Sequence, residues 1–192
     1  MRICVYGAAS NSIDDIYISE TEKLGREIAK HGHDLVYGAG ANGVMGAVAR
    51  GCHEGGADIV GVVPKFFNVD GIIYSHCNEL IRPDTMRERK QIMEDRADAF
   101  VIAPGGIGTF EEFFEILTLK QLSRHEKPIA VFNLNGYYDS MQAFIQNAID
   151  QGFLKKECFD LYKLCSSVDE IFDYFDNYVP VMYSIFDLKD IK

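Results

Sequence analysis

The chain contains 192 residues with a mass of 21.6 kDa, and its 47% hydrophobic and 25% charged residues are typical of a folded globular domain, which excludes a disordered or collagen-like chain. Lys and Arg number 19 against 29 Asp and Glu, so the net charge is −10. This charge excludes general nucleic-acid binding, which depends on a basic face that neutralises phosphates. An anionic ligand would therefore need a local device, such as backbone amides or one Arg.

The cysteines and the apolar runs indicate a cytoplasmic protein. The five cysteines are scattered along the chain and form no Cys-x-x-Cys pair, a pattern typical of reduced thiols rather than of disulfides. The apolar N-terminal segment is too short for the hydrophobic region of a signal peptide. No run reaches the roughly 20 apolar residues that a membrane helix needs, so we expect no contact with a membrane.

Short β-branched runs alternate with amphipathic stretches along the chain. In chain order, the predicted strands cover residues 3–6, 34–37, 59–63, 80–81, 99–103 and 129–134, and the predicted helices cover residues 19–31, 44–53, 85–96, 109–123 and 139–151. A looser stretch spans residues 66–77, and a final strand and helix lie within residues 162–178.

The predicted strands are continuous apolar runs, as in parallel sheets that helices cover on both faces. We therefore predict an α/β fold with a single Rossmann-like domain over residues 1–180 and a mostly parallel sheet of about seven strands with helices on both faces. The remaining residues, 181–192, form a C-terminal tail that is apolar and then charged.

A first glycine-rich turn follows the second predicted strand and contains a literal G-x-G-x-x-G at Gly38, Gly40 and Gly43. Alone, this motif indicates a dinucleotide site. However, the motif follows the second strand, and Asp58, the acidic residue about 20 positions later, begins the next strand instead of ending it, unlike a ribose-binding carboxylate. The alternative is a tight turn with close helix packing, which also leaves room for a nucleotide above it.

A second glycine-rich turn follows the predicted strand at residues 99–103. Gly105, Gly106 and Gly108 would let the backbone approach a ligand, and the hydroxyl of Thr109 would lie at the start of a helix. The turn lacks the Lys of a P-loop, which favours a monophosphate over a triphosphate. Alternatively, Thr109 and Glu112 form a capping box, although capping does not explain three glycines.

Several motifs together resemble the LONELY GUY (LOG) family of cytokinin riboside 5′-monophosphate phosphoribohydrolases, formerly described as lysine decarboxylases. The resemblance covers about residues 2–155, and its motifs are Pro-Gly-Gly-x-Gly-Thr-x-x-Glu at 104–112, Thr-Met-Arg-Glu-Arg-Lys at 85–90, and further matches at 118–122, 125–128 and 135–138. It implies hydrolysis of a nucleoside 5′-monophosphate to free base and ribose 5-phosphate. It also implies a homodimer with active sites near the subunit interface and no cofactor.

Carried over by position, the resemblance implies that Arg89 and Glu112 are the catalytic pair and that Met86 and Lys90 lie beside the substrate. The residues that it assigns to the phosphate and to ligand contact are Gly105, Gly106, Ile107, Gly108, Thr109 and Thr118. The chain departs from the family pattern after its first two strands, where Ala8 and Ala39 replace family residues, and at Gly71, beside Asp70, where many members carry an acid.

These assignments agree with the chemistry of the residues. Cleavage of an N-glycosidic bond builds positive charge on the ribose, so a carboxylate such as Glu112 stabilises the transition state and can orient or deprotonate a water. Met86, Arg89 and Met93 share one helical face, which would bring the guanidinium to a cavity where a thioether packs against a purine. The charge pattern alone favours a solvated Arg89 among its charged neighbours.

The sequence also leaves a second class of function open, a non-catalytic carrier of a nucleotide or of a pterin such as the molybdenum cofactor, because such carriers resemble this fold and its glycine loop. A carrier would have no use for Glu112 aligned with Arg89. The histidines show neither H-E-x-x-H nor a zinc-ligand spacing, so we predict no metal site. The sequence does not rank prenylated against plain adenine as the base.

Overall fold

The computed structural model describes residues 1–67, 71–180 and 183. One sheet of seven parallel strands runs through it in the order β4-β3-β2-β1-β5-β6-β7. The strands are β1 (Arg2–Tyr6), β2 (Asp34–Tyr37), β3 (Ile59–Val62), β4 (Glu79–Ile81), β5 (Ala99–Ile102), β6 (Ile129–Phe132) and β7 (Lys163–Cys165). The predicted parallel α/β sheet of about seven strands is confirmed.

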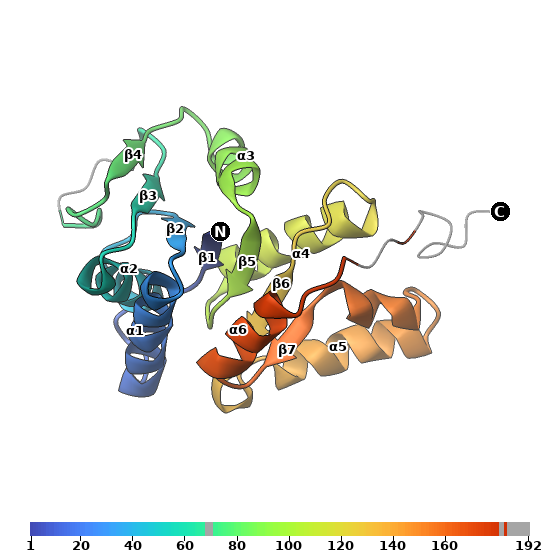
Figure 1. Cartoon of the computed structure of the whole chain (residues 1–192). Coiled ribbons are helices and arrows are strands. Elements are labelled where there is room, and N and C mark those ends of the chain that lie inside the picture. The colour runs from blue at the N-terminus through green and yellow to red at the C-terminus, as the bar shows by residue number, and fades with distance from the viewer. Residues whose placement is uncertain (68–70, 181–182, 184–192) are drawn as a thin grey trace.

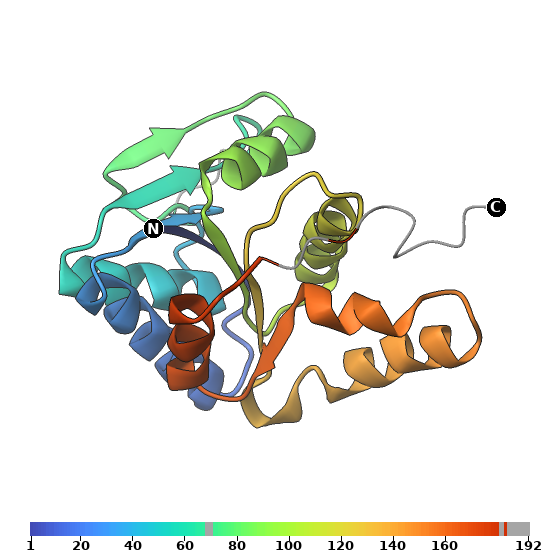
Figure 2. The same ribbon diagram turned by 45° about the vertical axis from the view of Figure 1, so that its right-hand side comes forward.

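Helices cover both faces of this sheet, as predicted (Figure 1, Figure 2). The α-helices are α1 (Asp15–Lys30), α2 (Gly43–Gly55), α3 (Met86–Arg96), α4 (Ile107–Gln121), α5 (Asp139–Asp150) and α6 (Val168–Asp176), and the short 3-10 helices are η1 (Leu134–Gly136) and η2 (Lys156–Leu161). Side chains alternate along each strand, so Ile3 and Val5 face α1, α2 and α6, whereas Cys4 and Tyr6 face α3, α4 and α5.

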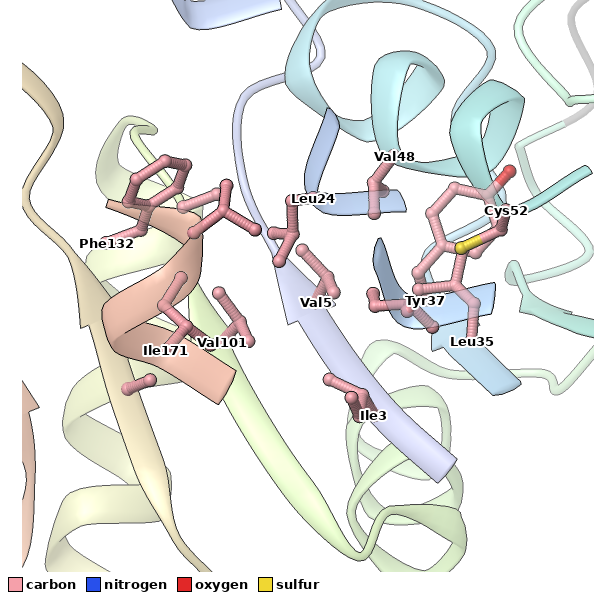
Figure 3. Packing of buried hydrophobic residues seen from close by; sticks show 14 of the residues in the cluster. Ile3, Val5, Leu24, Leu35, Tyr37, Val48, Cys52, Val101, Phe132 and Ile171 are labelled. Carbon is pink, nitrogen blue, oxygen red and sulfur yellow. The ribbon is translucent and has the colours of Figure 1, made fainter. Parts of the chain in front are cut away.

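The first of these two cores is densely packed (Figure 3). Val5 of β1 and Leu35 of β2 are buried with Leu24 of α1 and Val48 of α2, and Ile171 of α6 closes the same cluster beside β5 and β6. Each such side chain contributes about 1.5–3 kcal/mol on burial. This packing fixes the sheet and thereby the loops at the carboxyl ends of its strands.

Several predicted boundaries differ from the structure. Helix α1 begins at Asp15, four residues before the predicted start, and the edge strand β4, predicted at 80–81, begins one residue earlier at Glu79. Helix α4 begins at Ile107 because Gly106 is its N-cap. The predicted capping box of Thr109 and Glu112 is therefore wrong, since Thr109 is already the third residue of the helix.

The predicted C-terminal tail lies outside the described residues except at Tyr183, so its division from the domain stays a prediction. The Tyr183 hydroxyl donates to the Asp160 carboxylate at 2.6 Å, and its carbonyl oxygen accepts from Ser123 Oγ at 2.7 Å. In the described part of the chain, no helix combines the length and the apolar character needed to cross a membrane.

Candidate active site

A cavity of about 330 Å³ lies at the carboxyl end of the sheet, a volume within the usual range of small-molecule sites. It is bordered by the loops after β1, β2, β3 and β5 and by α3. The strand order reverses between β1 and β5, where open parallel sheets bind ligands. Its lining residues are Gly7, Ala8, Ala9, Gly38, Ala39, Gly40, Met45, Val63, Pro64, Phe67, Ile72, Ile73, Met86, Arg89, Gly106, Gly108, Thr109, Glu111 and Glu112.

An ion pair between α3 and α4 forms part of the cavity wall. Arg89 Nη1 donates to Glu112 Oε1 at 2.7 Å, and the two side chains are only 10% and 11% exposed. Arg89 Nε also donates to the carbonyl oxygen of Val62, at the end of β3, at 3.2 Å. The interpretation of Arg89 as a solvated surface residue is therefore wrong, because β3 and α4 both bind its guanidinium group inside the protein.

A capping box at the start of α3 positions Arg89. Thr85 Oγ1 accepts from the Glu88 N–H at 3.2 Å, and the Glu88 carboxylate accepts from the Thr85 N–H at 3.0 Å. The first turn of α3 is thereby fixed, and Arg89 follows on the helix face that also carries Met86 and Met93. Met93 is fully buried and Met86 lines the cavity, so the predicted common face is confirmed.

Gly38, directly after β2, provides the space for the guanidinium group. A Cβ atom at this position would lie 2.0 Å from Arg89 Nη2 and 2.6 Å from Met45 Cε. Any larger residue would therefore displace Arg89 or distort the turn. The first glycine of the G-x-G-x-x-G motif thus serves close packing against Arg89, in agreement with the packing alternative considered from the sequence.

Burial and the ion pair shift the pKa of the Glu112 carboxyl in opposite directions. Burial raises the pKa of the Glu112 carboxyl above its usual value, whereas the charge of Arg89 and its hydrogen bond oppose this rise. Arg89 thus favours the ionised carboxylate in a site where burial alone would favour the protonated acid. When ionised, the Glu112 carboxylate in the cavity wall can stabilise a positive charge that develops beside it.

The second glycine turn leaves the start of α4 open. The first intrahelical bond of α4 runs from the Phe110 N–H to the Gly106 carbonyl oxygen at 3.0 Å. The N–H groups of Ile107, Gly108 and Thr109 have no acceptor among the described residues. Unpaired amides at a helix N-terminus, together with the helix dipole, can bind an anion. Gly106, Gly108 and Thr109 also line the cavity, so this end of α4 faces the cavity.

The first glycine turn offers fewer such donors. Asn11 Oδ1 accepts from the Gly43 N–H at 2.8 Å, and the Ala8 carbonyl oxygen accepts from the Met45 N–H at 3.1 Å. Two of the first three amides of α2 are thus already paired within the protein. This pairing disfavours a pyrophosphate at the start of α2, which a dinucleotide would place there.

Four of the residues assigned by resemblance lie outside the cavity wall. Lys90 forms ion pairs with Glu111 and, at 2.8 Å, with Glu115. Ile107 is 82% exposed, and Thr118 is exposed farther along α4. Gly105 is buried and does not face the cavity. The other six (Met86, Arg89, Gly106, Gly108, Thr109 and Glu112) meet at the cavity.

Sequence reasoning missed the apolar wall opposite α4. Phe67, Ile72 and Ile73 come from the stretch described only as looser, and the Ile72 carbonyl oxygen accepts from the Ala41 N–H at 2.8 Å, which pins this segment against the turn after β2. The cluster of large apolar residues in a loop was the available signal. Asp70 lies outside the described residues, and Gly71 does not line the cavity.

Neither a metal-binding cluster nor a reactive cysteine is found among the described residues. Among the described residues, no group of three or more His, Cys, Asp or Glu side chains is arranged to hold a metal ion. All five cysteines are free. Burial raises the pKa of the thiols of Cys52 and Cys165 to about 12, so both stay protonated at neutral pH.

Comparisons with known proteins identify the family to which this chain is similar. A family model described as "Possible lysine decarboxylase" matches residues 45–175. The cytokinin riboside 5′-monophosphate phosphoribohydrolase LOG2 of Arabidopsis thaliana is 35% identical over 179 residues, which cover 93% of this chain and 84% of the relative. The enzyme named LOG in Oryza sativa subsp. japonica is 36% identical over 179 residues, covering 93% of this chain and 74% of the relative.

Solved structures show the same fold. The molybdenum cofactor carrier protein of Chlamydomonas reinhardtii superposes with a TM-score of 0.70 at 23% identity, covering 91% of this chain and 94% of that one. The molybdenum cofactor binding protein of Rippkaea orientalis gives a TM-score of 0.67 at 17% identity, covering 91% and 93%. At such identities the likeness shows the fold alone. The match to the family model and the identity to its curated relatives over most of the chain place this protein in the LOG family.

Proposed function

We propose that this protein is a hydrolase that cleaves the N-glycosidic bond of a nucleoside 5′-monophosphate, either a cytokinin riboside 5′-monophosphate or AMP. The products are the free adenine-type base and ribose 5-phosphate. The observation that carries this proposal is the buried pair of Arg89 and Glu112 in the wall of a cavity that also contains the open N-terminus of α4. The names of the LOG relatives support the same reaction.

The 5′-phosphate would bind at the start of α4. The free amides of Ile107, Gly108 and Thr109 can donate to phosphate oxygens, and the helix dipole favours the negative charge. The overall charge of −10 disfavours anions elsewhere, so this local device sets the position of the substrate. The absence of a P-loop Lys from the turn agrees with a monophosphate.

With the phosphate there, the ribose would lie across the cavity toward Glu112. As the bond between C1′ and the base nitrogen breaks, positive charge builds on the ribose ring, and the Glu112 carboxylate stabilises it. The same carboxylate orients a water whose oxygen bonds to C1′, while a water proton goes to the departing base. Arg89 keeps Glu112 in place, and its charge opposes the rise in the pKa of the Glu112 carboxyl that burial causes.

The base would pack against the apolar part of the wall, which includes Met45, Phe67, Ile72 and Met86. Thioether and aromatic side chains suit the face of a purine and also an apolar substituent on it. By family resemblance, we further propose that the protein acts as a homodimer, with its active sites near the subunit interface, and works in the cytoplasm without a cofactor.

The test is to incubate the protein with AMP and with N6-isopentenyladenosine 5′-monophosphate and to measure free base. Release of base from either compound supports the hydrolase, and binding without release supports a nucleotide or pterin carrier. Glu112→Gln should lower turnover by about 10²- to 10³-fold while the fold persists, because a neutral amide no longer stabilises the ribose cation. Glu115→Gln, one turn farther along α4 on an exposed carboxylate that pairs with Lys90, is the matched control and should stay active.

A further inference from the structure

The turn between β6 and α5 directs two neighbouring tyrosine hydroxyls at the glycine loop of the cavity. Tyr137 Oη donates to the Gly105 carbonyl oxygen at 2.6 Å, and Tyr138 Oη donates to the Ala103 carbonyl oxygen at 2.7 Å. Neither tyrosine lines the cavity, so neither is positioned to touch a ligand there. The two bonds hold the segment between β5 and α4 from behind.

Hydrogen bonds and ring contacts fix the turn between β6 and α5. Asn133 Nδ2 donates to Asp139 Oδ1 at 2.8 Å, and Asn133 Oδ1 accepts from the Tyr138 N–H at 2.7 Å. The ring of Tyr137 packs edge-on against Tyr17 of α1, with centroids 5.8 Å apart, and against Tyr138 at 4.9 Å. Because the backbone and the ring are both fixed, the Tyr137 hydroxyl has a defined position relative to the loop.

The two bonds have different consequences for the loop. In a trans peptide the C=O and the following N–H point in opposite directions. The Gly105 carbonyl points to Tyr137, so the N–H of Gly106 points away from Tyr137, and Gly106 lines the cavity. This N–H has no acceptor among the described residues. The carbonyl of Ala103, in contrast, belongs to a peptide that ends at Pro104, which has no N–H to direct.

We infer that Tyr137 is a positioning residue for phosphate recognition. Its hydroxyl fixes the peptide between Gly105 and Gly106 and thereby directs the Gly106 N–H at the anion, in addition to the amides of α4. This inference rests on the proposed function, because it concerns the phosphate end of the same site. Tyr137→Phe removes the hydroxyl while the ring contacts with Tyr17 and Tyr138 persist.

The experiment compares the wild type with Tyr137→Phe in four measurements: KM and kcat for AMP, the inhibition constants of ribose 5-phosphate and of adenine, the affinity for inorganic phosphate by calorimetry, and the melting temperature. We expect KM for AMP, the ribose 5-phosphate inhibition constant and the phosphate dissociation constant to rise about tenfold, the worth of one hydrogen bond to a charged group. The adenine constant and kcat should change less than about twofold, since the lost interaction acts equally on the ground and transition states.

Two further tyrosines serve as comparisons. Tyr162→Phe removes a hydroxyl that donates to Gln142 Oε1 at 2.7 Å, away from the loop, and should leave all the ligand constants unchanged. Tyr138→Phe removes a more deeply buried hydroxyl of the same turn, so it should lower the melting temperature more than Tyr137→Phe and weaken phosphate binding less. Equal weakening by Tyr137→Phe and Tyr138→Phe would overturn the role of the Gly105–Gly106 peptide.

The inference and the proposed function can fail separately. If the wild type releases no base, the proposed function fails, and weaker phosphate binding by Tyr137→Phe still supports the inference. If phosphate binds equally to both proteins, or to neither, the inference is overturned whether or not AMP is cleaved. A parallel loss of adenine and ribose 5-phosphate binding in Tyr137→Phe also overturns it, because the hydroxyl would then act on the whole cavity.

Discussion

Replacing Gly38 by Ala would place a methyl group where the guanidinium of Arg89 lies. The new Cβ would be 2.0 Å from Arg89 Nη2, whereas ordinary contacts begin at 3.4 Å, so the guanidinium must move by about 1.4 Å. Gly38 does not have a positive φ, and Ala therefore fits its backbone. The substitution acts through the displaced Arg89, with Met45 Cε at 2.6 Å as the second neighbour that must shift.

A displacement of this size breaks the 2.7 Å bond between Arg89 and Glu112. A misplacement of about 1 Å in a catalytic arrangement costs about 10²-fold in rate, so base release should fall by about 100-fold. The loss of the partner from a buried carboxylate also costs about 1–3 kcal/mol of stability. The melting temperature should therefore fall by a few degrees while a cooperative transition persists.

The pH profile of base release provides a sharper assay than a single rate. Arg89 lowers the pKa of Glu112 against the effect of burial, so its displacement should raise this pKa. Because the reaction uses the ionised carboxylate, activity is lost as the pH falls through the pKa of Glu112. The acidic limb of the profile should accordingly shift to higher pH in Gly38→Ala.

Gly40→Ala is the matched control in the same turn. The nearest atoms to a Cβ at Gly40 all belong to the Met45 side chain, at 3.3 Å, and a flexible side chain can yield by this amount. This variant leaves the bond between Arg89 and Glu112 in place, so it should keep its pH profile and lose much less activity than Gly38→Ala. A folded Gly38→Ala protein with wild-type activity and an unshifted acidic limb would refute the assigned role of Arg89.

Three further predictions concern single groups. Arg89→Lys should lower kcat/KM for AMP by about 10²-fold, because Lys lacks the forked donors that reach Glu112 and Val62. Arg87→Lys, at an exposed position of the same helix, should leave kcat/KM nearly unchanged. Equally small effects of both substitutions would show that Arg89 has only a structural role. Adenosine lacks the phosphate and forgoes several amide bonds of about 1.5–3 kcal/mol each, so its kcat/KM should be at least about 100-fold below that of AMP, and similar values would show that the glycine loop is misassigned. Burial lowers the pKa of Lys120 to about 8, so between about pH 8 and pH 10.5 Lys120 is protonated only in the unfolded chain. The free energy of unfolding should therefore rise over this pH range, and Lys120→Met should remove the rise in denaturation curves.

The fold was predictable because its signals are local. Continuous apolar runs such as Phe100–Ile102 are fully buried in the sheet, and helices separate them at the expected spacing. The boundaries were less accessible, because α1 begins in the polar segment at Asp15, where Asp14 gives no side-chain capping bond that would mark the start. Likewise, the N-cap of α4 is a glycine without a side chain, so Thr109, inside the helix, resembled its N-cap residue.

The site was predictable only in part, since its residues meet through tertiary structure. Arg89 and Glu112 are 23 positions apart and come together because α3 and α4 flank β5. Family resemblance named both residues, but no local pattern showed that Gly38 makes room for the guanidinium or that Tyr137 holds the Gly105 carbonyl. Such contacts depend on the packing of elements distant in sequence, which periodicity and propensity do not encode.

The burial of Glu112 separates a hydrolase from a carrier on physical grounds. A buried ion pair contributes little net stability, because desolvation offsets the attraction of its charges, so an apolar pair of side chains could hold α3 against α4 equally well. A carrier of a phosphorylated ligand needs the open amides of α4, and a carboxylate in the same wall repels the anion that they bind. Glu112→Gln should therefore strengthen the binding of ribose 5-phosphate whether this protein is a hydrolase or a carrier. Only a hydrolase would also lose turnover. If the variant binds ribose 5-phosphate more weakly, this electrostatic account of Glu112 is wrong.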